Sequence, residues 1–541
     1  MSDNPSVDID HIATVDGVRD GQVMCTIRAN ARRTGLAGAL CQFETDMQII
    51  LGRFGTIDLT NPMHDDRAFK GIIMAHGELP YFSGAADIEE AKIDIIACLD
   101  KDNKSLAPMR ANPASGTPIT PVSPENMEFF RRETEYHMYT GTSPEDDAVD
   151  ISVITREYSR DVQGWGEALH RAYFGQNGSG KTVFALTHLA GRLVMNPNMG
   201  CIIPDTAGDI SQPGKHTGGP SGYSFDFHGM LERGGRTYDL YTMEDLYLTE
   251  TYAFEDVLAN YLAKTIRLGQ LPNVEPLVQR VVATHVTKQD MKLQDVEFDA
   301  LISALASDAP NYWNKATGKQ KEQKLQDLVG DETEKKRFHN EVMSFFLGRM
   351  SLKQVVEGVL KQSKIIILDL MGLSERHKEL VMAELFRQIQ KRSAQQFKGN
   401  DSLLVNAEVV LDEAPRWIPQ GSKSDVSAMI TDAVKNTRKY GLSWTFIGQS
   451  MADIDNAVMR QSHTKWFGKN LGVGSDRGHL ETHLGKSGLQ MYESLALRGG
   501  FYFVGVGREV NLGANERPVA VMSYSGDASA TIIAKNLHIW R

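Results

Sequence analysis

Short apolar runs, many alternating with polar residues, recur through the first hundred residues of the chain. Examples are residues 22–27, 47–51 and 93–97, which are separated by glycines and polar clusters. Runs of this length, bounded by turn-forming residues, predict β-strands. We therefore expect residues 1–102 to form a small β-barrel domain. Five prolines within residues 103–125 then predict a linker.

A second pattern follows the linker, in which short apolar runs are separated by helical stretches. This alternation predicts an α/β fold, a mostly parallel sheet flanked by helices. A long helical stretch, residues 240–362, interrupts it and predicts an insertion. We expect a core in two parts, 126–239 and 363–515, and a C-terminal arm, 516–541. The predicted strands of the core are residues 172–174, 199–203, 364–370, 407–411 and 442–447.

The sequence GQNGSGKT, residues 175–182, lies between the first of these strands and the next helical segment. It fits the phosphate-binding loop pattern of glycine, four free positions and Gly-Lys-Thr. Glycines there can take positive φ and turn backbone N–H groups towards a phosphate at the helix N-terminus. Lys181 is expected to contact the β- and γ-phosphates of a bound nucleotide, and the Thr182 hydroxyl to bind Mg²⁺. The predicted nucleotide-binding residues of this loop are Gly175, Asn177, Gly178, Ser179, Gly180, Lys181, Thr182 and Val183.

Acidic residues follow several of the predicted strands, at the sheet edge where α/β folds collect their functional groups. Asp205 and Asp209 follow the second strand, and each suits either the γ-phosphate and its water or a plain turn. Asp369 and the pair Asp412 and Glu413 follow later strands. We favour the pair because adjacent carboxylates can divide two roles. Asp412 is then the Mg²⁺ ligand, and Glu413 activates the attacking water.

Two further candidates flank the last strand of the pattern. Arg438 precedes the strand, and Gln449 follows it. In ring-forming ATPases an arginine at a subunit edge can act on a neighbour's nucleotide. Gln449 is a candidate to bond the γ-phosphate and report its presence. The alternatives are an exposed arginine at a helix end and a polar turn residue.

The composition indicates a class of protein but does not indicate a function. With 541 residues, 41% of them hydrophobic and 23% charged, the chain suits a soluble protein of two or three domains. No apolar stretch is long enough to span a membrane, and the N-terminus is acidic where a signal peptide is basic. We therefore expect a cytoplasmic protein without a membrane partner. The four cysteines stand far apart, which favours reduced thiols over a zinc site.

The net charge of −11 argues against a surface that is basic throughout. It leaves room for a basic channel, because composition averages over location. The candidate channel residues near the last strand are Lys435, Lys439, Arg460 and Lys465.

The order of these motifs resembles one known group of proteins. The phosphate-binding loop is followed by IIPDTAGD at 202–209, VVLDEAPRW at 409–417 and TRKYGLSWTFIGQS at 437–450. Together they resemble the HerA branch of the HerA/FtsK superfamily of hexameric DNA-translocating ATPases. The region ahead of the linker is similar to that family's N-terminal barrel. The resemblance covers nearly the whole chain.

The resemblance implies a RecA-like P-loop core and a homo-hexamer that moves double-stranded DNA through its central channel by hydrolysing ATP with Mg²⁺. It implies that Asp205 belongs to the nucleotide site and that Asp412 and Glu413 hold the metal and activate water. Arg438 would act in trans, and Gln449 would be the sensor. It also implies a nuclease or NAD-consuming effector that docks on the barrel, in DNA end processing or anti-phage defence.

Two other functions remain open, and one feature departs from the family. The chain suits a ring-shaped scaffold that uses nucleotide binding to organise an effector enzyme, with little translocation of its own. It also suits a protein-secretion or conjugation ATPase, although such ATPases are often membrane-associated. In the family, Ala-His usually comes directly after the acidic pair, whereas Ala414 and Pro415 occupy these positions here. No residue at this place can therefore perform the role of that histidine.

Overall fold

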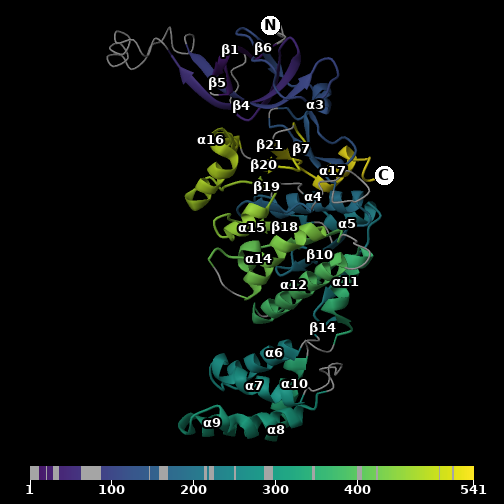
Figure 1. Ribbon diagram of the computed structural model, residues 1–541, viewed down its shortest axis with the longest axis vertical. Coiled ribbons are helices and arrows are strands. Elements are labelled where there is room, and N and C mark those ends of the chain that lie inside the picture. Colours follow the sequence, from purple (N-terminus) through teal and green to yellow (C-terminus); the bar gives the residue numbers. More distant parts are fainter. Residues whose placement is uncertain are drawn as a thin grey trace, which may run out of the picture.

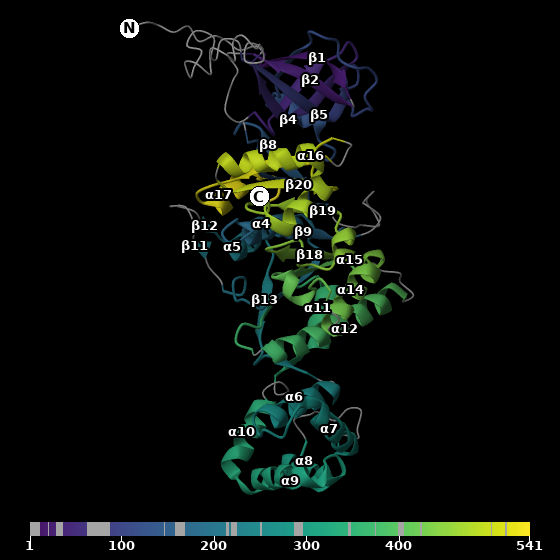
Figure 2. The ribbon, with the colours of Figure 1, turned by 90° about the vertical axis from the view of Figure 1, so that its left-hand side faces the viewer.

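The computed structural model consists of three bodies that follow one another along its long axis (Figure 1). A β-barrel lies at one end, a sheet covered by helices in the middle, and a helical body at the other end, as the turned view also shows (Figure 2). The structure describes residues 11–19, 21–28, 36–61, 87–144, 146–156, 168–212, 216–217, 224–248, 251–285, 296–343, 348–373, 375–398, 405–421, 425–498, 500–513 and 517–541.

The predicted N-terminal barrel is present. In the described part of the chain it is closed by six antiparallel strands in the order β1-β2-β5-β4-β3-β6. Buried residues alternate along β2, where Val23, Cys25 and Ile27 join the barrel core. The last strand comes from within the segment predicted as a linker, and its buried Ile119 pairs with Ala13. The strands are β1 (Ala13–Arg19), β2 (Gln22–Ile27), β3 (Leu40–Glu44), β4 (Gln48–Thr60), β5 (Ile88–Asp100) and β6 (Pro118–Pro121).

The middle body is built on one sheet, whose order over the described residues is β13-β16-β10-β17-β18-β9-β19-β20-β21-β7-β8. Neighbours from β13 to β19 run parallel, and those beyond β19 run antiparallel. The parallel strands are β13 (Tyr238–Thr242), β16 (Ile365–Asp369), β10 (Gly200–Asp205), β17 (Ala407–Leu411), β18 (Leu442–Gly448), β9 (Arg171–Phe174) and β19 (Thr464–Phe467). The others are β20 (Tyr502–Gly507), β21 (Val519–Ser523), β7 (His137–Thr142) and β8 (Asp150–Ile154).

This is the predicted RecA-like P-loop fold. Strand β9 leads into the phosphate-binding loop, and β17 leads into Asp412 and Glu413. Strand β18 lies between them, so the two strands are close without being direct neighbours. The carboxyl ends of these parallel strands therefore share one edge of the sheet.

Helices cover both faces of the parallel strands, which explains why these strands are continuous apolar runs. Ile202 and Val409 belong to one hydrophobic cluster, and their neighbours Ile203 and Val410 to the other. One face packs against α4 (Lys181–Met195), α5 (Phe227–Arg233) and α17 (Ala528–Lys535). The other packs against α11 (Leu352–Gln362), α12 (Glu375–Lys398) and α14 (Asp425–Thr437).

The predicted insertion contains the helical body, which lies at the end of the molecule farthest from the barrel (Figures 1 and 2). A short parallel pair, β14 (Leu246–Tyr247) and β15 (Met350–Ser351), joins it to the middle body. No helix in the described ranges is long and apolar enough to cross a membrane. The helices of this body are α6 (Thr251–Lys264), α7 (Leu271–His285), α8 (Phe298–Asp308), α9 (Lys315–Gly330) and α10 (Glu332–Met343).

Candidate active site

The predicted phosphate-binding loop connects the end of β9 to the first residue of α4. Gly178 and Gly180 take positive φ, at 75° and 78°, as the turn requires. Gly175 is required for a different reason, because a Cβ there would lie 2.5 Å from Ser179 Oγ. The loop is held by the bond from Gly175 N to Gly448 O, at 3.3 Å. Contacts within this chain therefore hold the loop in this shape.

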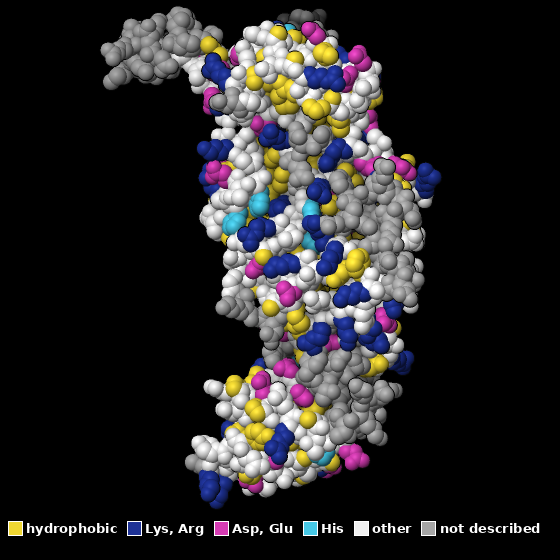
Figure 3. All heavy atoms as spheres, viewed as in Figure 1, with side chains coloured by type: hydrophobic (Ala, Val, Ile, Leu, Met, Phe, Trp, Pro, Cys, Tyr) yellow, Lys and Arg dark blue, Asp and Glu magenta, His cyan; other side chains and the backbone are white. Residues whose placement is uncertain are grey.

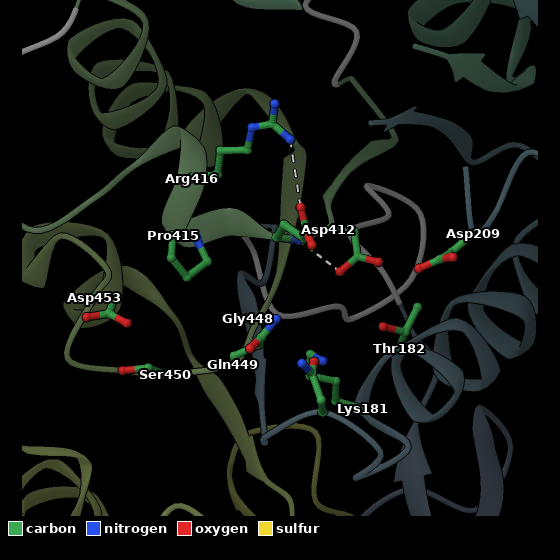
Figure 4. Close-up of a pocket in the computed structure, with 12 residues that line it drawn as sticks. Lys181, Thr182, Asp209, Asp412, Pro415, Arg416, Gly448, Gln449, Ser450 and Asp453 are labelled. Carbon is green, nitrogen blue, oxygen red and sulfur yellow. Dashed lines mark hydrogen bonds and ion pairs between the residues drawn. The ribbon is translucent and has the colours of Figure 1, made fainter. Parts of the chain in front are cut away.

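A cavity of about 280 Å³ opens beside the loop (Figure 4). It brings together residues that follow β9, β10, β17 and β18, all at the carboxyl edge of the sheet. The side-chain oxygens of Thr182, Asp209 and Asp412 are turned towards one another in the close-up. The lining residues are Asn177, Lys181, Thr182, Asp209, Asp412, Glu413, Pro415, Arg416, Gly448, Gln449, Ser450 and Asp453.

Asp412 is a buried carboxylate, only 8% exposed, and no arginine of the described residues pairs with it. Its Oδ1 accepts a hydrogen bond from the backbone N–H of Glu413, at 2.8 Å. The pKa of Asp412 is raised to about 6, mainly by burial and to a smaller extent by the charges of Glu413 and Asp209. The hydrogen bond from the Glu413 N–H and the Lys181 charge act in the opposite direction. A bound cation would favour the charged form of this carboxylate.

Glu413 lies at the cavity mouth in a left-handed conformation, with φ 50° and ψ 41°. A residue other than glycine is uncommon there, and such positions cluster at functional sites. The carboxylate is 45% exposed and lies 3.9 Å from Arg416 Nη1, while Arg416 also pairs with Glu375. Pro415 stands where the family resemblance predicted histidine. Its ring packs so closely on Gly448 that a Cβ at that glycine would lie 2.9 Å from Pro415 Cδ.

Gln449 lies in the cavity lining on the loop that follows β18, and a residue that the sequence did not reveal holds this loop. Asp476 accepts hydrogen bonds on Oδ1 from Ser450 Oγ at 3.1 Å, Met451 N at 2.8 Å and Ala452 N at 3.0 Å. The acid stands 27 residues from Gln449 in sequence, in the first turn of α16 (Gly474–Arg498). The one signal for Asp476 in the sequence is that it is an acidic residue near the start of a helix.

Asp205, predicted as part of the nucleotide site, lies outside the cavity lining. Its carboxylate accepts four backbone N–H groups of the turn after β10: those of Ala207, Gly208, Ile210 and Ser211, at 2.6–3.2 Å. These bonds shape the turn that carries Asp209 to the cavity. Asp369, the other acid considered for the metal, is also outside the lining.

Arg438 lies at the amino-terminal end of β18, so the length of that strand separates it from its own chain's cavity. Its Nη1 contacts His463 Nε2 at 2.6 Å. Burial and then the charge of Arg438 are the leading causes that lower the pKa of His463 to about 4. Lys435, Lys439 and Arg460 are exposed on elements near this end of the strand. Lys and Arg side chains recur over the middle body on one face of the molecule (Figure 3).

The residues fit a nucleotide triphosphate and Mg²⁺. Ser179 Oγ is buried and finds no hydrogen-bond partner within the described ranges, and it lies in the loop that leads into the N-terminus of α4. The first turn of a helix leaves N–H groups free to bind an anion. No group of three or more His, Cys, Asp or Glu among the described residues could hold a metal ion. Mg²⁺ suits this sparse set, since it is usually bound through one or two carboxylates, phosphate oxygens and waters.

No protein-family model matches the chain, and no curated protein matches it. Among solved structures it is similar to VirB4 of Thermoanaerobacter pseudethanolicus, at 14% identity and a TM-score of 0.41, over 74% of this chain and 99% of that chain. It is also similar to the bacterial conjugative coupling protein TrwB, at 12% identity and 0.41, over 75% and 92%. A third is the genome packaging NTPase B204 from Sulfolobus turreted icosahedral virus 2, at 9% identity and 0.29, over 66% and 98%.

Proposed function

We propose that the chain is an ATP-hydrolysing, ring-forming translocase for double-stranded DNA, of the HerA type. One observation carries the hydrolytic part: the cavity unites Lys181 and Thr182 with Asp412, Glu413 and Gln449 at one edge of the sheet. The translocase part rests on the resemblance of the motifs, in their order along the chain, to the HerA branch.

Each residue of the cavity has a role in this proposal. Lys181 and the loop N–H groups bind the phosphates, and Thr182 and Asp412 hold Mg²⁺, with Asp209 beside them. The metal ion would neutralise the charge that develops on the phosphate oxygens. Glu413, the more exposed carboxylate, accepts the proton of the attacking water on its own oxygen. Gln449 bonds the γ-phosphate from the opposite wall.

The ring is proposed from Arg438. This arginine lies at the edge of the sheet opposite its own cavity, so it could act on a nucleotide only in another copy of the chain. A homo-hexamer would complete each site in this way, and double-stranded DNA would pass through its centre. Docking of a nuclease or NAD-consuming effector on the barrel belongs to the same proposal and rests on the resemblance alone.

The test is the ATPase rate with and without double-stranded DNA. Lys181→Ala is expected to weaken nucleotide binding at least about 100-fold, because the phosphates lose their cation. Glu413→Gln should keep nucleotide binding and lose about 100-fold or more in kcat. Asp369→Asn, the matched control at the end of β16, should change both by less than about twofold, because it lies outside the cavity lining. Normal turnover in Glu413→Gln would refute the assignment of the site.

The scaffold alternative predicts a different pattern. There, effector activity survives in Glu413→Gln, because nucleotide binding alone is needed, and DNA does not stimulate hydrolysis. Mixing Arg438→Ala subunits with Glu413→Ala subunits tests the trans arginine. Mixed rings should regain activity, since some sites then combine an intact Glu413 with a neighbour's intact Arg438. Activity that fails to return at every mixing ratio would count against that role.

A further inference from the structure

Helix α16 connects the nucleotide cavity to the N-terminal barrel, and neither the motifs nor the proposed chemistry assign it a role. Its first turn carries Asp476, which is 8% exposed and accepts three hydrogen bonds from residues 450–452. These bonds hold the loop directly after Gln449. An aspartate that only capped its helix would accept from N–H groups of its own first turn. The three hydrogen bonds that Asp476 accepts come instead from the cavity loop.

The middle of α16 is interrupted at Gly485, whose φ of 70° and ψ of 172° are not helical. This combination is essentially confined to glycine. No described atom lies within 4 Å of the position where a Cβ would be. A side chain at residue 485 is therefore disfavoured by the backbone conformation and not by a lack of space. Gly485 therefore divides α16 into one half at the cavity and one half at the barrel.

The second half of α16 is joined to the barrel through a partly buried polar contact, which we call the barrel joint and define as Arg53, Asp94 and Ser487. Ser487 Oγ donates to Asp94, which also pairs with Arg53 and accepts from Gln22 Nε2 at 2.7 Å. Arg53, only 1% exposed, also donates to Pro518 O. The barrel is thus tied both to α16 and to the chain leading into β21.

The surfaces at this joint are in close contact. A Cβ at Gly55 would lie 2.6 Å from Ser487 Oγ, and one at Gly38 would lie 2.8 Å from Met491 Cγ. Burial tends to raise the pKa of Asp94, but the Arg53 charge and the hydrogen bonds from Ser487, Gln22 and Arg53 hold it below its usual range. The joint is therefore a charged contact in which the Asp94 carboxylate accepts from three side chains. Such contacts fix geometry more strictly than apolar packing does.

We propose that Asp476 is a positioning residue for the Gln449 loop, and that α16 makes nucleotide turnover depend on the barrel joint. This inference rests on the proposed hydrolysis in the cavity. Its physical content is one continuous chain of contacts, from the loop through Asp476 and α16 to Ser487 and Asp94. A chain of contacts becomes evidence of coupling only when changes at its two ends are not independent.

The first test compares Asp476→Ala with Asp476→Asn. Loss of the acceptor in Asp476→Ala should lower kcat about tenfold, since a small displacement of a positioning group slows the reaction more than it weakens binding. Nucleotide affinity should change less than about twofold, because Asp476 does not touch the phosphate-binding loop. Asp476→Asn retains the Oδ1 acceptor and should recover most of kcat. Equal losses of kcat and affinity would refute the positioning role.

The second test is made at the barrel joint. Ser487→Ala should lower kcat about threefold alone and cause no further loss when combined with Asp476→Ala. The matched control is Ser494→Ala, because Ser494 Oγ donates within α16, to Gln490 O at 2.9 Å, and not to the barrel residues that the structure describes. If Ser487→Ala destabilises the barrel, Gln490→Ala removes the exposed contact with Thr56 instead. Losses of kcat that multiply independently would refute the coupling.

Amide hydrogen exchange separates this inference from the proposed function. Without nucleotide, Ser487→Ala and Asp476→Ala should both speed exchange at residues 449–452, while Ser494→Ala leaves it unchanged. This measurement needs no hydrolysis. If the wild type hydrolyses no ATP but exchange responds at the loop, the proposed function fails and the linkage stands. An unchanged exchange rate in Ser487→Ala overturns the linkage even in an active ATPase.

Discussion

Two buried acids near the two ends of strand β17, Glu408 and Asp412, have opposite electrostatic surroundings although they are only four residues apart. Glu408, within the strand, is fully buried and accepts from Arg192 at 2.7 and 3.1 Å, with Arg171 3.7 Å away. Burial acts to raise its pKa, but Arg192 and Arg171 hold it below its usual range. Asp412, just beyond the strand, is also buried, but the described part of the chain places no such arginine beside it, and its pKa is raised to about 6.

The difference separates buried charges that stabilise the fold from buried charges that are available to bind a ligand. Arg171, Arg192, Glu408 and Glu509 form a neutral group, which we call the buried charge cluster, and it joins β9, α4, β17 and the segment after β20. It fixes the strand and the helix on either side of the phosphate-binding loop. Asp412 in the cavity has no equivalent arginine partner among the described residues, and Glu413 has only the half-exposed contact with Arg416 at 3.9 Å. A buried carboxylate without a positively charged side-chain partner suits a bound cation.

The largest effect is expected from breaking the buried charge cluster. Glu408→Gln keeps the shape of the side chain but leaves Arg192 and Arg171 without their shared carboxylate. Removing one partner of a buried ion pair destabilises a protein by about 3–5 kcal/mol. The free energy of unfolding in denaturant measures this, with Asp369→Asn as the control, expected within about 0.5 kcal/mol. A loss in Glu408→Gln no larger than in the control would mean that the cluster does not stabilise the fold.

The opposite sign is expected at Asp412, with a smaller size. Asp412→Asn removes a buried, unpaired charge while keeping an acceptor for the Glu413 N–H. Without nucleotide, unfolding should therefore require about 1–2 kcal/mol more than in the wild type at pH 7, since one pKa unit corresponds to about 1.4 kcal/mol. The added stability that ATP and Mg²⁺ give should disappear in this variant. Destabilisation of the nucleotide-free variant would contradict the comparison with Glu408.

Local patterns were enough to predict the cavity but not the cluster. The loop at 175–182 and the acids after β17 are each contiguous in sequence, and apolar runs mark the strands that bring them together. The residues alone do not separate Asp205 from Asp209, because the choice depends on a turn, and the family resemblance assigns Asp205 to the nucleotide site. In the structure Asp205 accepts four N–H groups of that turn, and Asp209 lines the cavity.

The parts that escaped prediction depend on contacts between distant residues. Arg171 and Glu509 are 338 residues apart, and each alone resembles an ordinary surface charge in the sequence. Asp476 has no motif, because its function is set by the loop that packs against it. Strand β6 lies among prolines that favour a linker, and pairing with β1 and β3 overrides that local preference.

The smallest effect concerns His188, which lies beside the buried charge cluster. Its Nδ1 contacts Tyr173 OH at 2.9 Å, and its Nε2 contacts Thr140 Oγ1 at 2.5 Å. Burial, Arg192 and Arg171 lower the pKa of His188 well below its usual value. The unfolded chain therefore takes up a proton that the folded chain does not. Stability present above the ordinary histidine pKa of about 6.5 is lost as the pH falls below it.

The measurement is the pH dependence of unfolding in wild type and His188→Gln. His188 should contribute about 1 kcal/mol of the stability lost between pH 7 and about pH 5.5, so the curve of the variant should be shallower by that amount. Other buried histidines, such as His170 and His137, also have lowered pKa values and contribute to both curves alike. Parallel curves of stability against pH would mean that His188 becomes protonated in the folded protein over this pH range. The charges of Arg171 and Arg192 would then have little effect on its pKa.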